Sequence, residues 1–364
     1  MSRSKIEMSS LVFKKIHEAA AKQDATYIED DHDRWLSKKD DADLAIMTDA
    51  QVEVLTLGAK IFSVSISTEN SKYYCFSGLP VPPILPQNLE EVEATPGLFS
   101  CVVWFANILS TSTSSTARDI LQDQYKGYDN YSGHDLNDVL QLFPKLYFVK
   151  VNTSAKEVYL DDINRVTGAY ICSGYYDGPL QINEELRSRL LTLFEAGAET
   201  IPFNLPLQGI LSYSWSAMFL DLYRCLEQLY TALKLKELVA KLPFEGSLAE
   251  LAYLLENELS WRPKEQDALA SILATTQEAT RKNILSAFVP DITVINEYPS
   301  TKCAAHVYKL RNSHVHFRPA MKAETLPSEK WNEIVLAMCD AVDDVYEKIG
   351  ADFLTKKQSS PIAE

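Results

Sequence analysis

The sequence contains no apolar run as long as the roughly 18 to 20 residues that a membrane-spanning helix needs. Residues Met1 to Lys22 also lack the apolar stretch and the small-residue cleavage site of a secretory signal. We therefore expect a soluble, cytoplasmic protein that contacts no membrane. No GxGxxG, P-loop or GxSxG motif is present, so the motif signals of dinucleotide binding, P-loop NTPases and α/β-hydrolases are missing.

Cysteine is sparse, and the six cysteines lie far apart with no CxxC pair among them. This spacing favours neither a zinc site nor a disulfide framework, and we interpret these cysteines as small buried hydrophobes. Hydrophobic residues make up 46% of the 364 residues and aromatic residues 10%, which is the composition of a folded protein. The length suffices for two or three domains, and we expect no metal and no cofactor.

Positive charge is scarce, because the formal net charge is −15 at pH 7. This balance argues against nonspecific binding to nucleic acid, which depends on Lys and Arg side chains that displace counterions from phosphates. One segment is an exception: Pro299 to Ala323 contains no Asp or Glu and carries the five basic residues Lys302, Lys309, Arg311, Arg318 and Lys322. We call this segment the basic island and expect it to attract phosphate. A plainer interpretation is that its lysines only solvate a helix surface.

Two prolines and an amide interrupt regular structure between Ile201 and Pro206, and we place a domain boundary there. We predict an α+β domain over residues 1–205, an all-α helical bundle over residues 207–354 and a disordered tail over residues 355–364. Apolar residues downstream of the boundary recur with a period of about 3.6, which is typical of amphipathic helices. The expected helices are Trp215 to the residue before Pro243, Leu248 to Leu255, a segment opened by Pro263, helical turns around Asn283 to Phe288, a helix from Ser300 or Thr301 to the residue before Pro319, and a last helix capped by Ser328.

The N-terminal domain carries the β-branched and aromatic residues of short strands. The expected strands are residues 52–56, 61–67, 73–76, 101–105, 146–151 and 169–172. Met8 to Ala21 is predicted to be an amphipathic helix and Ser110 to Thr116 a flexible loop. The acidic run Glu29 to Asp33 has the charge to bind a cation, although a solvated loop is the simpler interpretation.

The most informative stretch, Tyr308 to Phe317, places Arg311, Asn312 and His316 on one predicted helix. An Arg guanidinium binds phosphate oxygens through paired hydrogen bonds and stays charged at any physiological pH. A His side chain, with an unperturbed pKa of about 6.5, both accepts and donates a proton near neutrality. These residue types together are suited to phosphodiester cleavage without a metal ion.

The spacing resembles the R-x4-H signature of HEPN nucleases, in the form where Asn follows the Arg. The resemblance covers about residues 207–354 and implies a helical bundle with endoribonuclease activity. It implies that a ribose 2′-hydroxyl attacks the adjacent phosphorus, leaving a 2′,3′-cyclic phosphate and a 5′-hydroxyl. His316 would be the general base or acid, Arg311 would stabilise the phosphorane, and Asn312 would orient His316 or the substrate. Proteins of this family often act as toxins or phage-defence effectors, which implies an activator or antitoxin as a further partner and a sensing role for the N-terminal domain.

Lys309, Arg318 and His314 are the expected RNA-binding residues beside this catalytic group. His314 is in register with the apolar residues Val307 and Leu310, which favours a position in the core. The family more often has an apolar residue at this position, so the sequence leaves open which imidazole carries the proton.

The helical geometry favours a homodimer formed through the bundle. At about 100° per residue, Asn312 and His316 share a helix face, whereas Arg311 lies about 140° from His316. One helix cannot easily close both side chains around a single phosphate, but two copies related by a twofold axis can. The HEPN family is known for this dimeric arrangement.

Each assignment has a structural alternative. Arg311 has the chemistry to pair with an acid of the bundle such as Glu227, and Asn312 to make only local hydrogen bonds. His316 is also a residue type favoured at a helix C-terminus. The alternative function is a non-catalytic HEPN-type module that binds RNA or dimerises.

Overall fold

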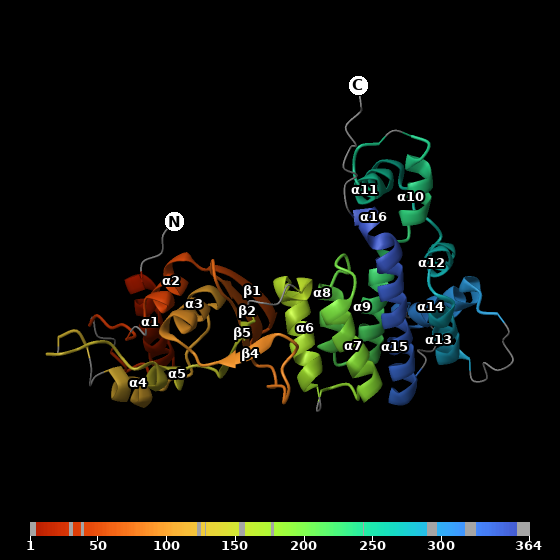
Figure 1. Ribbon diagram of the computed structural model, residues 1–364. Helices are drawn as coiled ribbons and strands as arrows, with labels where there is room; N and C mark the ends of the chain where they lie inside the picture. The colour runs from red at the N-terminus through yellow and green to blue at the C-terminus, as the bar shows by residue number, and fades with distance from the viewer. Residues whose placement is uncertain are drawn as a thin grey trace, which may run out of the picture. The chain divides into compact units, whose positions relative to one another are not determined.

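Figure 1 shows the computed structural model of the chain, which describes residues 5–28, 32–37, 40–121, 125–127, 129–152, 157–175, 178–242, 244–289, 297–316 and 325–354. The chain divides into two compact units, residues 1–163 and 164–364, which we call unit 1 and unit 2. Unit 1 contains the β-sheet, and the regular structure described in unit 2 is helical. The expected combination of α and β structure is therefore confirmed.

Unit 1 is built on a five-stranded antiparallel sheet with the strand order β1-β2-β3-β5-β4. The strands are β1 (Gln51–Gly58), β2 (Ile61–Ser67), β3 (Lys72–Ser77), β4 (Leu89–Val92) and β5 (Leu146–Val151). The register places Val54, Val64, Cys75 and Phe148 opposite one another across four strands. Directly opposed residues point to the same face of a sheet: Val64, Cys75 and Phe148 belong to the hydrophobic core of unit 1, and the partly buried Val54 packs against it.

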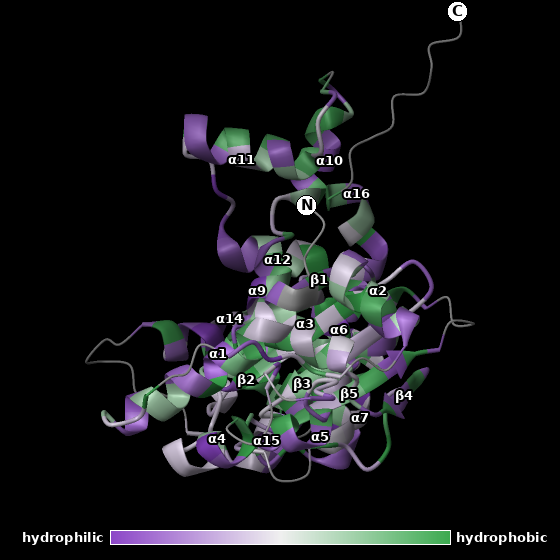
Figure 2. Cartoon of the chain, turned by 90° about the vertical axis from the view of Figure 1, so that its left-hand side faces the viewer, coloured by the Kyte–Doolittle hydropathy of each residue, from purple (hydrophilic) through white to green (hydrophobic). Residues whose placement is uncertain are grey.

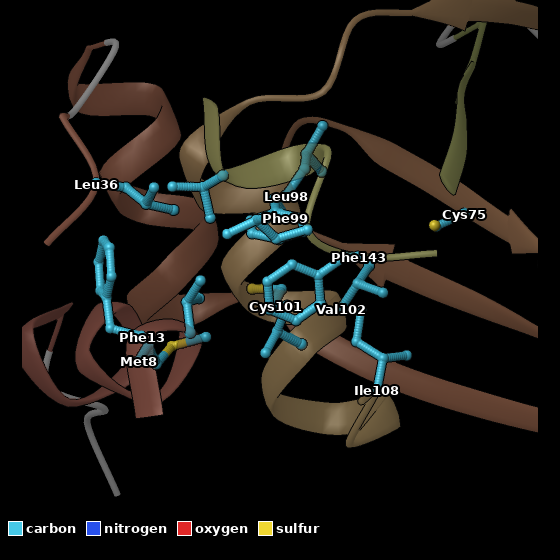
Figure 3. Packing of buried hydrophobic residues seen from close by; sticks show 14 of the residues in the cluster. Met8, Phe13, Leu36, Cys75, Leu98, Phe99, Cys101, Val102, Ile108 and Phe143 are labelled. Atoms are coloured by element: carbon cyan, nitrogen blue, oxygen red, sulfur yellow. The ribbon is translucent and has the colours of Figure 1, made fainter. Parts of the chain in front are cut away.

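Helices cover this face of the sheet. Unit 1 contains α1 (Lys5–Gln23), α2 (Asp41–Asp49), α3 (Pro96–Ala106), α4 (Ser114–Leu121), α5 (Leu136–Leu140) and the 3₁₀ turn η1 (Val158–Asp161). The central helix is α3, which contacts α1, α2, β1 and β2. Figure 3 shows side chains of α1, such as Met8, and of α3, such as Phe99, in one buried cluster. Each such buried side chain stabilises the fold by about 1.5 to 3 kcal/mol relative to exposure.

Four predicted strands, at residues 52–56, 61–67, 73–76 and 146–151, are confirmed, as is the helix over Met8 to Ala21. The strands predicted at 101–105 and 169–172 are wrong, because both segments are helical. Thr95 explains the first error: its side chain accepts a hydrogen bond from the Leu98 N–H and caps a helix that Pro96 opens. Strand β4 is not among the predicted strands, because the charged residues Glu90 and Glu91 occupy its centre. Charged residues are typical of an edge strand.

The segment Ser110 to Thr116 is only partly a loop, since α4 begins at Ser114. Ser110 and Ser112 are buried, and their hydroxyls donate to the carbonyl oxygens of Leu142 and Ile16 respectively. Buried serines that satisfy backbone carbonyls fix a segment that composition alone describes as flexible. Glu29 to Asp31 of the acidic run lie outside the described residues.

Unit 2 consists of helices in its described regular structure. They are α6 (Ile163–Gly174), α7 (Glu184–Ala196), α8 (Asn204–Ile210), α9 (Trp215–Glu227), α10 (Ala232–Val239), α11 (Leu248–Leu259), α12 (Glu265–Leu273), α13 (Glu278–Phe288), α14 (Ser300–Val315), α15 (Ser328–Val345), the π-helical turn η3 (Tyr346–Gly350) and α16 (Ala351–Leu354). The long helix α15, dark blue in Figure 1, contacts α7, α9, α12 and α13. An apolar stripe along α15 is buried: Trp331, Ile334, Val335, Met338, Val342 and Val345. The neighbouring helices pack against this apolar stripe, so α15 lies at the centre of their contacts.

Helix α11 is packed less completely than α15. Leu248 is its buried residue, and the helix contacts α10 and α16. Figure 2 shows hydrophobic and hydrophilic residues mixed along its length. Its N-terminus is nevertheless well defined, because Ser247 and Glu250 form a reciprocal capping box.

The division between the units lies earlier than the boundary expected near residue 205, so α6 and α7 belong to unit 2. Arg165 joins these helices, because its guanidinium donates to the carbonyl oxygens of Phe194, Glu195 and Gly197 at the end of α7. Pro206 does not end regular structure but lies in the first turn of α8, where its missing N–H is not needed.

Two expected helix limits also differ. The helix predicted from Trp215 to Pro243 is broken by a turn between α9 and α10. The apolar period continues through the break because Leu229 and Tyr230 in the turn are themselves buried. Ser328 begins α15 but makes no side-chain cap, since the position before the helix is Pro327. Residues 317–324 and the expected tail 355–364 lie outside the described residues.

No helix in the described parts of the chain is both long enough and apolar enough to cross a membrane.

Candidate functional site

The helix that carries the Arg-Asn-His motif is α14, which begins at Ser300 as expected. Cys303, Ala304, Val307 and Leu310 form its buried face, and α14 contacts α9, α12 and α13. Val307 and Leu310, with which His314 is in register, are thus buried, while Phe317 lies outside the described residues. Burial of this face fixes the rotation of α14 and therefore the directions of the motif side chains.

Arg311 points into the bundle, and its side chain is only 15% exposed. Its Nη2 lies 3.7 Å from Oε1 of Glu227 on α9, and its Nη1 lies 3.4 Å from Oε2 of Glu265 on α12. The guanidinium carbon lies 5.6 Å from the ring centre of Tyr223, also on α9. Arg311 is therefore held by two carboxylates and one aromatic face from two different helices.

Asn312 is the nearest polar neighbour of Arg311 along the chain. Its Oδ1 accepts a hydrogen bond of 3.0 Å from Nη1 of Arg311, and its backbone carbonyl accepts the N–H of His316 at 3.1 Å. The amide side chain thus makes a local hydrogen bond, as the structural alternative anticipates, and this bond orients the guanidinium.

His316 is the residue that ends α14, with φ −106° and ψ 104°. Its side chain is exposed, whereas Arg311 is mostly enclosed. An exposed imidazole at the end of a helix is accessible to a substrate and also lies at the negative pole of the helix dipole.

His314 faces inward, and its ring lies 5.5 Å from that of Trp331 on α15, tilted by 48°. The contact agrees with the core position indicated by the apolar register. Of the other predicted RNA-binding residues, Lys309 is exposed on α14, and Arg318 lies outside the described residues together with Lys322. Lys302, near the start of α14, is exposed as well.

The acids beside Arg311 are electrostatically unusual. Burial raises the pKa of Glu227 above its ordinary value, Arg311 and Arg224 oppose this shift, and Glu265 adds to it. Beneath the guanidinium, burial raises the pKa of Tyr223 to about 12, and the Tyr230 hydroxyl donates to that of Tyr223 at 2.6 Å. The phenols stay neutral at physiological pH, so the charges of this cluster are one guanidinium and two carboxylates.

The sequence suggests Glu227 as a partner of Arg311 but gives no indication of Glu265 or Tyr223. Glu265 is the first residue of α12, where an acid is also favoured by the helix dipole, so its type carries no signal of pairing. Tyr223 falls among the buried apolar residues of α9. Only the packing of α9, α12 and α14 brings these side chains together.

The cysteines are buried, as the sequence indicates. Burial raises the pKa of Cys303 to about 11 and that of Cys339 to about 12, so these thiols are protonated at neutral pH. No three His, Cys, Asp or Glu side chains of the described residues are grouped so as to hold a metal ion.

Within one chain the motif thus provides an enclosed, acid-paired guanidinium and an exposed imidazole at the end of the same helix. A guanidinium can bind a phosphate and an imidazole can move a proton, provided that the guanidinium exchanges its carboxylates for the phosphate. No protein-family model matches the chain, and comparisons with curated proteins and with solved structures likewise give no match.

Proposed function

We propose that the chain is a metal-independent endoribonuclease whose reacting groups are carried by α14. The observation that carries the proposal is the position of His316, exposed at the end of the helix that also bears Arg311 and Asn312. The resemblance of residues 311–316 to the HEPN motif supports it. We further propose that RNA is the substrate, that the active form is a homodimer through the bundle, and that the protein acts in the cytoplasm as a toxin or phage-defence effector under an activator or antitoxin.

The proposed reaction needs no added nucleophile. The ribose 2′-hydroxyl loses its proton to an imidazole and forms a bond to the adjacent phosphorus, while the bond from phosphorus to the 5′-oxygen breaks. The 5′-oxygen takes a proton, so the products are a 2′,3′-cyclic phosphate and a 5′-hydroxyl. His316 transfers the proton, and Arg311 stabilises the extra negative charge on the phosphorane.

A homodimer is part of this proposal for a geometric reason. Arg311 and His316 lie about 140° apart around one helix at about 100° per residue, and Arg311 faces α9 and α12. A second copy of α14 would supply the imidazole that one helix cannot bring to its own guanidinium.

A second function is favoured by a different observation. The ion pairs of Arg311 with Glu227 and Glu265 are what a purely structural arginine would make. In that case unit 2 is a non-catalytic module that binds RNA or a partner through exposed basic residues such as Lys309.

The test is cleavage of a single-stranded RNA by the purified full-length protein in excess EDTA. We expect cutting with cyclic-phosphate ends, no cutting of the same sequence in DNA or with 2′-O-methyl riboses, and a loss of about 10²- to 10⁴-fold in His316→Ala. His306→Ala is the matched imidazole control on the same helix, because His306 stacks on Phe288 away from the motif. RNA that is bound but never cut would establish the module instead.

A further inference from the structure

The environment of Arg311 contains more negative than positive charge. Glu227 and Glu265 approach it from α9 and α12, and the next cation on α9, Arg224, is engaged with Asp221. The phenols of Tyr223 and Tyr230 contribute no charge at neutral pH, because burial raises the pKa of both. A phosphodiester that approaches Arg311 therefore meets two carboxylates around one guanidinium.

These two ion pairs are loose. The separations of 3.7 Å and 3.4 Å are longer than the 2.7 to 2.9 Å or so of a charge-assisted hydrogen bond. The buried Oε2 atom of Glu265 accepts no hydrogen bond from any described residue, so its main compensation is the charge of Arg311. The side chains of Glu227 and Glu265 remain 39% and 38% exposed, which gives each carboxylate a route to water.

The geometry points to an exchangeable carboxylate lock: Glu227 and Glu265 occupy Arg311, and an RNA phosphodiester gains Arg311 only by displacing them. This inference rests on the proposed function, because it concerns the regulation of the same site. Any event that moves α9 or α12 away from α14, or neutralises one carboxylate, would make Arg311 available. The lock gives a physical reason why a protein with this nuclease motif would stay inactive until the two carboxylates are displaced.

The test measures binding of a single-stranded 2′-O-methyl RNA oligonucleotide, which cannot be cleaved by 2′-hydroxyl attack, to the full-length protein at pH 7.5. The variants are Glu227→Gln and Glu265→Gln. The matched control is Glu258→Gln, an exposed acid on α11 whose substitution changes net charge by the same amount. We expect the two lock variants to bind about threefold to tenfold more tightly than the wild type, and the control to differ by less than about twofold.

A second measurement uses pH. Glu227 has a raised pKa, so lowering the pH protonates it and releases the lock in the wild type but changes nothing at this position in Glu227→Gln. Histidine protonation affects both proteins alike and cancels in the ratio of their dissociation constants. The affinity of Glu227→Gln for the oligonucleotide should exceed that of the wild type by less and less as the pH falls.

Glu227→Gln is sufficient by itself to test the lock if Glu265→Gln does not fold.

The outcomes separate this inference from the proposed function. If the lock variants bind no more tightly than Glu258→Gln, or if no protein binds the oligonucleotide, the lock is refuted, whether or not unmodified RNA is cut. If the lock variants bind more tightly but neither they nor the wild type cut unmodified RNA, the lock stands and the nuclease assignment fails.

Discussion

In the described part of unit 2, Arg189 and Arg311 each face two carboxylates, and they differ in how they hold them. Arg189 on α7 donates from Nε to Asp340 at 2.7 Å and from Nη2 to Asp343 at 2.8 Å, both on α15. Arg311 on α14 faces Glu227 and Glu265 at 3.7 Å and 3.4 Å, on two different helices. Both guanidinium groups are mostly enclosed, with side chains 21% and 15% exposed.

The difference in distance has a chemical consequence. Arg189 uses its donors in short, charge-assisted hydrogen bonds, and burial, which lowers its pKa, is outweighed by Asp340 and Asp343, which raise it. Arg311 uses one donor for Asn312 and keeps its carboxylates at ion-pair distance only. Arg189 therefore joins α7 to α15, whereas the partners of Arg311 are of a kind that a phosphate can replace.

The largest expected effect separates the two arginines by activity. Arg311→Ala should lower the rate of RNA cleavage by about 10²- to 10³-fold, because it removes the charge that stabilises the phosphorane. Arg189→Ala should leave the rate per folded molecule within about twofold, since Arg189 belongs to the α7–α15 junction. Single-turnover cleavage, normalised to the folded fraction from circular dichroism, measures both. Equal losses of cleavage rate in the two variants would show that Arg311 has no catalytic role that Arg189 lacks.

Stability should show the reverse order. Arg189→Ala leaves two partly buried aspartates without their guanidinium, and we expect it to cost about 2 to 3 kcal/mol in the free energy of unfolding. Arg311→Ala should cost less than about 1 kcal/mol, because its carboxylates are partly exposed and return to water. Urea unfolding followed by circular dichroism gives both values. A larger cost for Arg311→Ala would mark it as the structural arginine.

Neutralising one carboxylate in each cluster sharpens the comparison. Asp340→Asn weakens the hydrogen bond from Arg189 and should lower the free energy of unfolding by about 1 to 2 kcal/mol. Glu227→Gln should change the free energy of unfolding by no more than about 0.5 kcal/mol, because the separation of 3.7 Å involves no hydrogen bond to lose. Thermal unfolding of the two variants beside the wild type compares them directly.

The smallest expected effect is the pH dependence of stability at Glu227. Its folded-state pKa is raised above the ordinary value of 4.5, so the folded chain binds this proton more readily than the unfolded chain does. Stability therefore falls as the pH rises through the range between 4.5 and the folded pKa. At pH 7 the free energy of unfolding of Glu227→Gln should exceed that of the wild type by a few tenths of a kcal/mol, after allowance for solvent screening. Below that pH range the two proteins should be equally stable. If the stability advantage of Glu227→Gln over the wild type grew as the pH fell, the upward direction of the Glu227 pKa shift would be wrong.

The helices after residue 205 follow more closely from local pattern than the elements before it do. The stripe of α15 from Trp331 to Val345 and the start of α14 at Ser300 agree with the helical period. The segment from Cys101 to Phe105 has strand-like residues but is helical, because Thr95 and Pro96 begin a helix before it. Local propensity misleads where a cap or tertiary burial outweighs it.

The candidate site divides in the same way. The motif spacing singles out Arg311, Asn312 and His316, and the helical angle separates Arg311 from His316. The register of His314 with Val307 agrees with its contact to Trp331. Spacing within one helix does not indicate that Glu265 lies against Arg311, because their contact depends on how two helices pack.

The helical period, the buried faces of α14 and α15, and the chemical types available at the motif follow from the order of the residues alone. The enclosure of Arg311 between Glu227 and Glu265, with His316 facing solvent, depends on how the helices pack together. The physical reason is that a helix face is set by side chains a few residues apart, whereas the neighbours of that face are set by burying the apolar surfaces of all the helices at once.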